Sequence, residues 1–120
     1  ELKASRKIYF WDLGIRNAII GNLAQIENRT DAGELWENFV IAERMKRNAY
    51  KCSFAQSYFW RTRQQHEIDY LEEEDGILYA FEFKWNLRKA NVKCPESFKT
   101  AYPEAVYKVI TPENIEEFLF

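Results

Sequence analysis

The sequence has few cysteines and no long apolar segment. Its two cysteines, Cys52 and Cys94, show no C-x-x-C spacing, which argues against a zinc site, and they are too few for a disulfide framework, although one bond between them stays open. The one histidine, His66, has no second ligand at zinc spacing. No apolar run approaches the length of a bilayer span, and no signal-peptide pattern is present. We therefore expect a soluble, cytoplasmic protein.

The chain also lacks an excess of positive charge. Its formal net charge is −2 and its pI is near 5.5, which excludes a protein that holds nucleic acid mainly by neutralising phosphates. A role on nucleic acid would need a local patch, a metal ion or another part of a longer protein. The phosphate-binding string G-x-x-x-x-G-K-[ST] is absent, so we expect no ATP site in these 120 residues.

What the chain does contain is enough apolar material for one folded domain. Hydrophobic residues make up 47% and aromatic residues 17% of the sequence. We expect a single domain over residues 1–120, with a leading segment (1–30), a core (31–111) and a C-terminal helix (112–120). The chain begins at Glu1 without an initiator methionine, so we expect a piece of a longer protein.

Apolar periodicity and turn signals predict the order of elements in the core. A helix is expected from residue 31 to about 48, because apolar residues recur at helical spacing there. Strands are expected over 56–61, 67–74, 77–85 and 106–110, with a short helix over 95–101 before the last strand. This order predicts a mixed central sheet flanked by helices, in the α+β or α/β class.

Residues 67–84 allow a prediction of strand register. Asp75-Gly76 is a strong signal for a two-residue hairpin turn between two alternating segments. With that turn, Asp69 lies opposite Glu82 and Glu67 lies opposite Lys84, and alternation places these four side chains on one face.

The other face of this hairpin is apolar. It pairs Ile68 with Phe83 and Tyr70 with Phe81 in the same register. On the charged face, like charges directly opposite each other destabilise a sheet, and a divalent cation would compensate the Asp69–Glu82 pair. The alternative is a solvated face.

Five strings in this order resemble the domain of unknown function found C-terminal to AAA-type ATPases in bacteria and archaea, within the PD-(D/E)XK nuclease-like superfamily. They are K-I-Y-F-W-D-L-G (7–14), G-E-L-W-E-N-F-V (33–40), Y-F-W-R-T (58–62), H-E-I-D-Y (66–70) and A-F-E-F-K (80–84). The resemblance implies an αβββαβ restriction-endonuclease-like core and an ATPase domain in cis, N-terminal to this one.

The resemblance also implies a metal site. Asp69, Glu82 and the Phe83 carbonyl would hold Mg²⁺ or Mn²⁺, and Lys84 would orient the attacking water and offset charge on the phosphorane-like transition state. Glu37 would act from the helix, as a ligand or through a water; the alternative is a residue that only borders the apolar arc of that helix.

Several of these side chains have alternative interpretations. Glu67 would support Lys84 at the site, or the two would form an ordinary cross-strand salt bridge. Glu43 falls on the apolar arc of its helix, so it is expected to pair, for example with Arg61, or to lie where the apolar face meets an opening. Trp60 and Trp85 flank the carboxylates, where they could stack on bases or pack in the core.

The residues leave two main functions open, beside a self-contained interaction domain in which the E-x-K string is fortuitous. The first is metal-dependent phosphodiester hydrolysis of DNA. The second is an inactive binding or regulatory module that links an ATPase to DNA, to a protein partner or to further copies of itself. A basic rim would favour DNA, and its candidates are Arg61, Arg63, Arg88, Lys89 and Lys93.

Overall fold

The computed structural model describes residues 8–64, 66–86 and 93–120. Its elements, in chain order, are α1 (Leu13–Ile20), the 3₁₀ turn η1 (Ile26–Asn28), α2 (Ala32–Tyr50), β1 (Gln56–Arg61), β2 (Glu67–Glu74), β3 (Ile77–Phe83), α3 (Glu96–Ala101), β4 (Val106–Ile110) and α4 (Ile115–Leu119). The predicted bounds of β1, β2 and β4 are confirmed, and β3 ends two residues earlier than predicted. In the described ranges, no helix has the length and apolar character that a bilayer span requires.

The four strands form one mixed sheet in the order β1-β2-β3-β4. Neighbours β1, β2 and β3 are antiparallel, and β4 returns parallel to β3 after α3. The hairpin turn is the predicted one, because Asp75 and Gly76 both have positive φ (53° and 78°), as a type I′ turn requires. Tyr70 lies opposite Phe81, which confirms the predicted register over this part of the hairpin.

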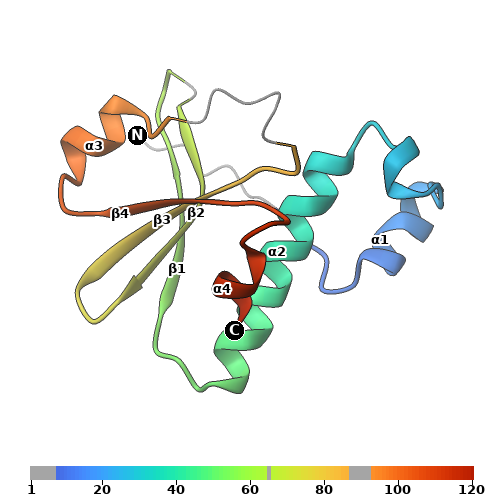
Figure 1. Ribbon diagram of the computed structural model, residues 1–120, viewed down its shortest axis with the longest axis horizontal. Helices are drawn as coiled ribbons and strands as arrows, with labels where there is room; N and C mark the ends of the chain where they lie inside the picture. Colours follow the sequence, from blue (N-terminus) through green and yellow to red (C-terminus); the bar gives the residue numbers. More distant parts are fainter. Residues whose placement is uncertain (1–7, 65, 87–92) are drawn as a thin grey trace.

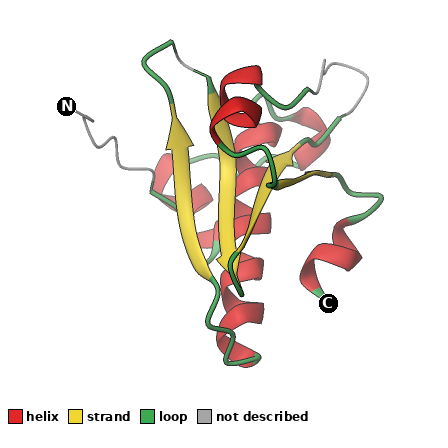
Figure 2. Cartoon of the chain, turned by 90° about the vertical axis from the view of Figure 1, so that its left-hand side faces the viewer, coloured by secondary structure: helices red, strands yellow, loops and turns green. Residues whose placement is uncertain are grey.

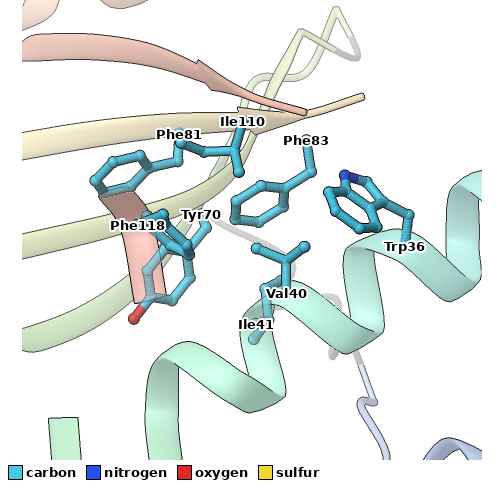
Figure 3. Packing of buried hydrophobic residues seen from close by; sticks show 8 residues of the cluster. All are labelled: Trp36, Val40, Ile41, Tyr70, Phe81, Phe83, Ile110 and Phe118. Carbon is cyan, nitrogen blue, oxygen red and sulfur yellow. The ribbon is translucent and has the colours of Figure 1, made fainter. Parts of the chain in front are cut away.

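Helices cover both faces of the sheet (Figures 1 and 2). Helices α2 and α4 cover one face, here called the α2 face, and α3 covers the other, the α3 face. On the α2 face the buried cluster consists of Trp36, Val40, Ile41, Tyr70, Phe81, Phe83, Ile110 and Phe118 (Figure 3). On the α3 face it consists of Ile68, Leu71, Ala80, Cys94 and Phe98. The predicted fold class, a mixed sheet flanked by helices, is confirmed.

A β-bulge in β2 changes the predicted pairing. Tyr58 pairs with Leu71 and Trp60 with Ile68, so two steps along β1 correspond to three steps along β2. The extra residue lies between Ile68 and Leu71, where a bulge disrupts the ladder and redirects side chains. The prediction that Ile68 shares a face with Phe83 is therefore wrong, because Ile68 packs on the α3 face and Phe83 on the α2 face.

A buried ion pair joins α2 to the sheet. The Arg44 guanidinium forms two bonds with the Glu72 carboxylate, from Nε to Oε2 (3.0 Å) and from Nη2 to Oε1 (2.8 Å). The Tyr70 hydroxyl donates to the same carboxylate at 2.9 Å, and Arg44 also donates to the Phe118 carbonyl. These contacts fix the position of α2 over β2, and α2 carries one of the predicted site residues, Glu37.

Candidate active site

Asp69 lies in the β2 bulge, and its carboxylate contacts the neighbouring strand. Its Oδ2 accepts a hydrogen bond from the Phe83 backbone N–H at 2.9 Å. Phe83 is the last residue of β3, and the next N–H, that of Lys84, donates to the Ile110 carbonyl of β4 at 2.9 Å. The Asp69 carboxylate is thus anchored at the point where β3 ends.

Glu82 and Lys84 lie at the same end of β3. Glu82 alternates with the two buried phenylalanines beside it, so its side chain leaves the sheet on the α3 face. The Lys84 Nζ lies 3.2 Å from the Glu82 Oε1, with the two side chains 34% and 17% exposed. The E-x-K pair is therefore joined directly and only partly solvated.

Glu67 contacts Arg61 and not Lys84, its predicted partner. Its Oε2 lies 4.0 Å from the Nε of Arg61 across the β1–β2 pair, and both side chains are 43% exposed. A solvated ion pair at this distance stabilises little. The carboxylate that pairs with Lys84 is that of Glu82, so the expected Glu67–Lys84 pairing is replaced by these two contacts.

Glu37 is positioned by the segment that precedes α1. Its Oε1 accepts a hydrogen bond from the Tyr9 hydroxyl at 2.8 Å. The neighbouring Asn38 side chain, which is buried, holds the Phe10 backbone through both groups: Phe10 N donates to Oδ1 (2.9 Å) and Nδ2 donates to the Phe10 carbonyl (2.6 Å). Tyr9 and Asn38 are site residues that the sequence reasoning missed.

Two tyrosine hydroxyls show how the carboxylates are distributed. Burial raises the pKa of Tyr9, the hydrogen bond to Glu37 and the charge of Glu37 raise it further, and the charge of Asp69 adds to this. Burial also raises the pKa of Tyr107, followed by the charge of Glu82 and, more weakly, that of Asp69. The charge of Asp69 thus contributes to the raised pKa of both hydroxyls.

The donor set suits a metal that keeps much of its water. Over residues 8–64, 66–86 and 93–120, no three His, Cys, Asp or Glu side chains come together as a metal-binding group. Mg²⁺ is commonly held by one or two carboxylates together with water and substrate phosphate, not by a cage of protein ligands. Two carboxylates and a backbone carbonyl, as predicted for Asp69, Glu82 and Phe83, match that chemistry and do not match a closed structural site.

The family assignment agrees with part of the resemblance. The family described as "Domain of unknown function (DUF4143)" matches residues 32–118, from the start of α2 to α4. The chain belongs to this family. No solved structure matches it.

Two relatives of this DUF4143 domain are longer proteins. They are "Uncharacterized protein Rv2008c" of Mycobacterium tuberculosis and "Uncharacterized protein Mb2031c" of Mycobacterium bovis, and each is 32% identical to the chain over 84 residues. The aligned part covers 68% of this chain and 18% of each relative. The chain thus spans about a fifth of the length of these relatives.

The structure of the DUF4143 domain identifies the partner of Glu43. Glu43 forms its ion pair with Lys46 on the same helix, at 2.8 Å, whereas Arg61 lies near Glu67. An i,i+3 pair satisfies a half-buried carboxylate without a partner from another element. The expectation that Glu43 is paired is therefore confirmed, but its partner is Lys46 and not Arg61.

The two tryptophans beside the site pack against other aromatic rings of the domain. Trp60 meets Phe98 edge-on at 5.2 Å between ring centroids, and Trp85 lies 5.4 Å from Trp36. Both contacts favour a packing role over base stacking. Of the predicted basic rim, Arg88 and Lys89 lie outside the described residues.

Proposed function

We propose that this domain is a metal-dependent phosphodiesterase of the PD-(D/E)XK type that acts on DNA. The observation that carries the proposal is the placement of Asp69. Its carboxylate is redirected by a β-bulge and anchored to the backbone of Phe83, beside the E-x-K residues Glu82 and Lys84. Bulges are over-represented next to active sites, where they re-aim a side chain.

In this proposal, the carboxylates of Asp69 and Glu82 and the Phe83 carbonyl would hold Mg²⁺ or Mn²⁺. Such an ion supplies Lewis acidity at a phosphoryl oxygen and lowers the pKa of its bound water. Lys84, already 3.2 Å from Glu82, orients the attacking water and offsets negative charge on the phosphate. Glu37 acts from α2 through a water, with its carboxylate oriented by the Tyr9 hydroxyl.

The proposal places this activity in a longer protein. Because the chain spans 18% of the relatives' length, other parts of such a protein must account for most of its sequence. We propose an AAA-type ATPase domain N-terminal to this one, in the cytoplasm, with ATP bound there and not in these 120 residues.

The second candidate is an inactive binding or regulatory module. It is favoured by the fact that Glu37 and Glu82 have protein partners, Tyr9 and Lys84, and that α1 exposes apolar side chains. Such a surface suits a protein partner or a further copy of the chain. The two candidates differ in their response to metal.

Calorimetric titration with Mn²⁺ separates them. The proposal expects binding in about the micromolar range that is lost in Asp69→Asn/Glu82→Gln and kept in Glu73→Gln, an exposed carboxylate of the same hairpin. Lys84→Ala should keep Mn²⁺ binding and lose DNA cleavage, because the lysine contacts water and phosphate and not the metal. Unchanged affinity in the double variant, or no binding at millimolar Mn²⁺, would replace the proposal with the binding module.

A further inference from the structure

A cavity of about 530 Å³ lies between α3 and β4, on the α3 face of the sheet. This volume is within the range of pockets that hold small organic ligands. Its aromatic lining consists of Phe98, Tyr102 and Tyr107, and the charged residues among those that line it are Lys93 and Lys99. The charged side chains that line the cavity are thus both positive, and one of them, Lys99, also lies 3.6 Å from the Glu96 carboxylate on the same helix. This combination suits a ligand with a flat ring and an anionic group.

Tyr102 presents a supported aromatic face. Its side chain is 45% exposed, while the ring of Phe98 behind it is almost fully buried. The two ring centroids are 5.2 Å apart, and the Tyr102 N–H donates to the Phe98 carbonyl at 2.8 Å, which fixes the residue at the end of α3. Stacking on such a platform tolerates any base, because every base has a π-face.

The cavity adjoins the candidate active site. Tyr107 of β4 lies beside Ala80 of β3 in the parallel register, and Glu82 is the next residue of β3 on the same face. The raised pKa of Tyr107 has the charge of Glu82 as a cause after burial, which agrees with this placement. A ligand against Tyr107 therefore lies next to the E-x-K pair, Glu82 and Lys84.

From this geometry we infer that the cavity binds one unpaired nucleotide of a single-stranded nucleic acid, with its base on Tyr102 and its phosphate near Lys93 and Lys99. A base held in a duplex is stacked and paired and cannot enter such a pocket. The inference deepens the proposed function and rests on it for the reaction: it makes single strands, overhangs and flaps the substrate class of the Asp69–Glu82 site. Binding itself needs no metal.

Fluorescence anisotropy of the full 120-residue chain tests this, with a labelled short oligothymidylate, its duplex form and EDTA throughout. The single strand should bind more tightly than the duplex. Tyr102→Ala should weaken single-strand binding by at least about fivefold, and Tyr102→Phe should retain it, because stacking needs the ring and not the hydroxyl.

Salt titration tests the lysines separately. In Lys93→Ala/Lys99→Ala, the slope of log affinity against log salt should fall in magnitude by about 1.4, which corresponds to two lost phosphate contacts on a single strand. Lys108→Ala is the matched control, because Lys108 is exposed on the opposite face of β4, and its slope should stay near that of the parent. If Tyr102→Ala does not fold, the salt titration of the lysine variants tests the inference instead.

The inference is overturned if duplex binds as well as single strand, if thymidine monophosphate competes as strongly as the oligonucleotide, or if Tyr102→Ala binds like the parent. In a separate experiment, addition of Mn²⁺ distinguishes the nucleotide pocket from the proposed nuclease activity. Tyr102-dependent binding without cleavage would keep the pocket and reject the nuclease. Cleavage that is insensitive to Tyr102→Ala would keep the nuclease and reject the pocket.

Discussion

Removal of the Glu72 carboxylate should destabilise the domain more than removal of any exposed carboxylate. Glu72 is 1% exposed, and its carboxylate accepts two bonds from Arg44, one from Tyr70 and one from Asn48 (3.3 Å). Loss of one partner from a buried ion pair leaves the other charge uncompensated and costs about 3–5 kcal/mol. We expect a cost of this size for Glu72→Ala.

Urea denaturation followed by far-ultraviolet circular dichroism measures this cost. With a denaturant slope of about 1–3 kcal/mol per molar urea, the midpoint should fall by more than about 1 M. Glu73→Ala, at the adjacent exposed position, should change the free energy of unfolding by less than about 0.5 kcal/mol. Glu72→Leu/Arg44→Met removes both charges and should be milder than Glu72→Ala, since no buried charge remains unpaired.

The same carboxylate should contribute to the acid limit of stability. Burial alone would raise the pKa of Glu72, but the hydrogen bonds and charge of Arg44 outweigh it and hold the pKa below the ordinary value of 4.5. A carboxyl whose pKa is lowered on folding stabilises the protein above its unfolded pKa, and this stabilisation is lost as pH falls through the folded pKa. In Glu72→Gln, the free energy of unfolding should therefore depend less on pH below about pH 4.5 than it does in the parent. A change below 1 kcal/mol for Glu72→Ala, or a double variant no milder than the single, would refute this reasoning.

Three further predictions concern local geometry. Asp69→Ala should lower the free energy of unfolding in urea by about 1–3 kcal/mol, because it removes the acceptor of a strand N–H. Asp69→Asn keeps an acceptor and should cost less, and equal losses in the two variants would contradict the hydrogen bond. Gly76→Ala should lower the free energy of unfolding by about 1–2 kcal/mol, because φ at this position is +78°. Gly33→Ala lies in a helix where an added Cβ meets open space, so it should be neutral or stabilising by up to about 1 kcal/mol. The reverse order would count against the turn. In thiol titration of the native chain, exposed Cys52 should react well before Cys94, whose pKa is raised by burial; simultaneous reaction would be inconsistent with this packing.

The elements whose sequence pattern is local could be predicted. The Asp75-Gly76 pair set the hairpin turn, and the alternation on either side of it set the Tyr70–Phe81 pairing. Of the apolar residues that helical spacing places on one side of α2, Leu35, Trp36, Val40 and Ala42 are buried, whereas Phe39 is 37% exposed. In each case the signal lies within a few residues and depends only on backbone period.

The features that define the site are tertiary and could not be predicted in this way. The position of a one-residue bulge cannot be located from the pattern of β2, so the face predicted for Ile68 is wrong. The bond from Tyr9 to Glu37 joins positions 28 residues apart, and the partner of Glu72 lies equally far away on α2. The string K-I-Y-F at 7–10 was a signal for Tyr9, but only through the resemblance.

The bulge in β2 also determines how the domain tolerates changes of length. Ile68 and Leu71 both pack on the α3 face although they are three residues apart, because the bulge adds one residue between them. Deletion of Asp69 would leave Ile68 and Leu71 two residues apart, so that regular alternation would keep both of them on the α3 face and Tyr70 on the α2 face. Loss of one residue elsewhere in β2 would instead shift part of the strand by one position and turn its apolar side chains to the wrong helix layer. Natural length variation within β2 should therefore be tolerated at the bulge and avoided in the rest of the strand.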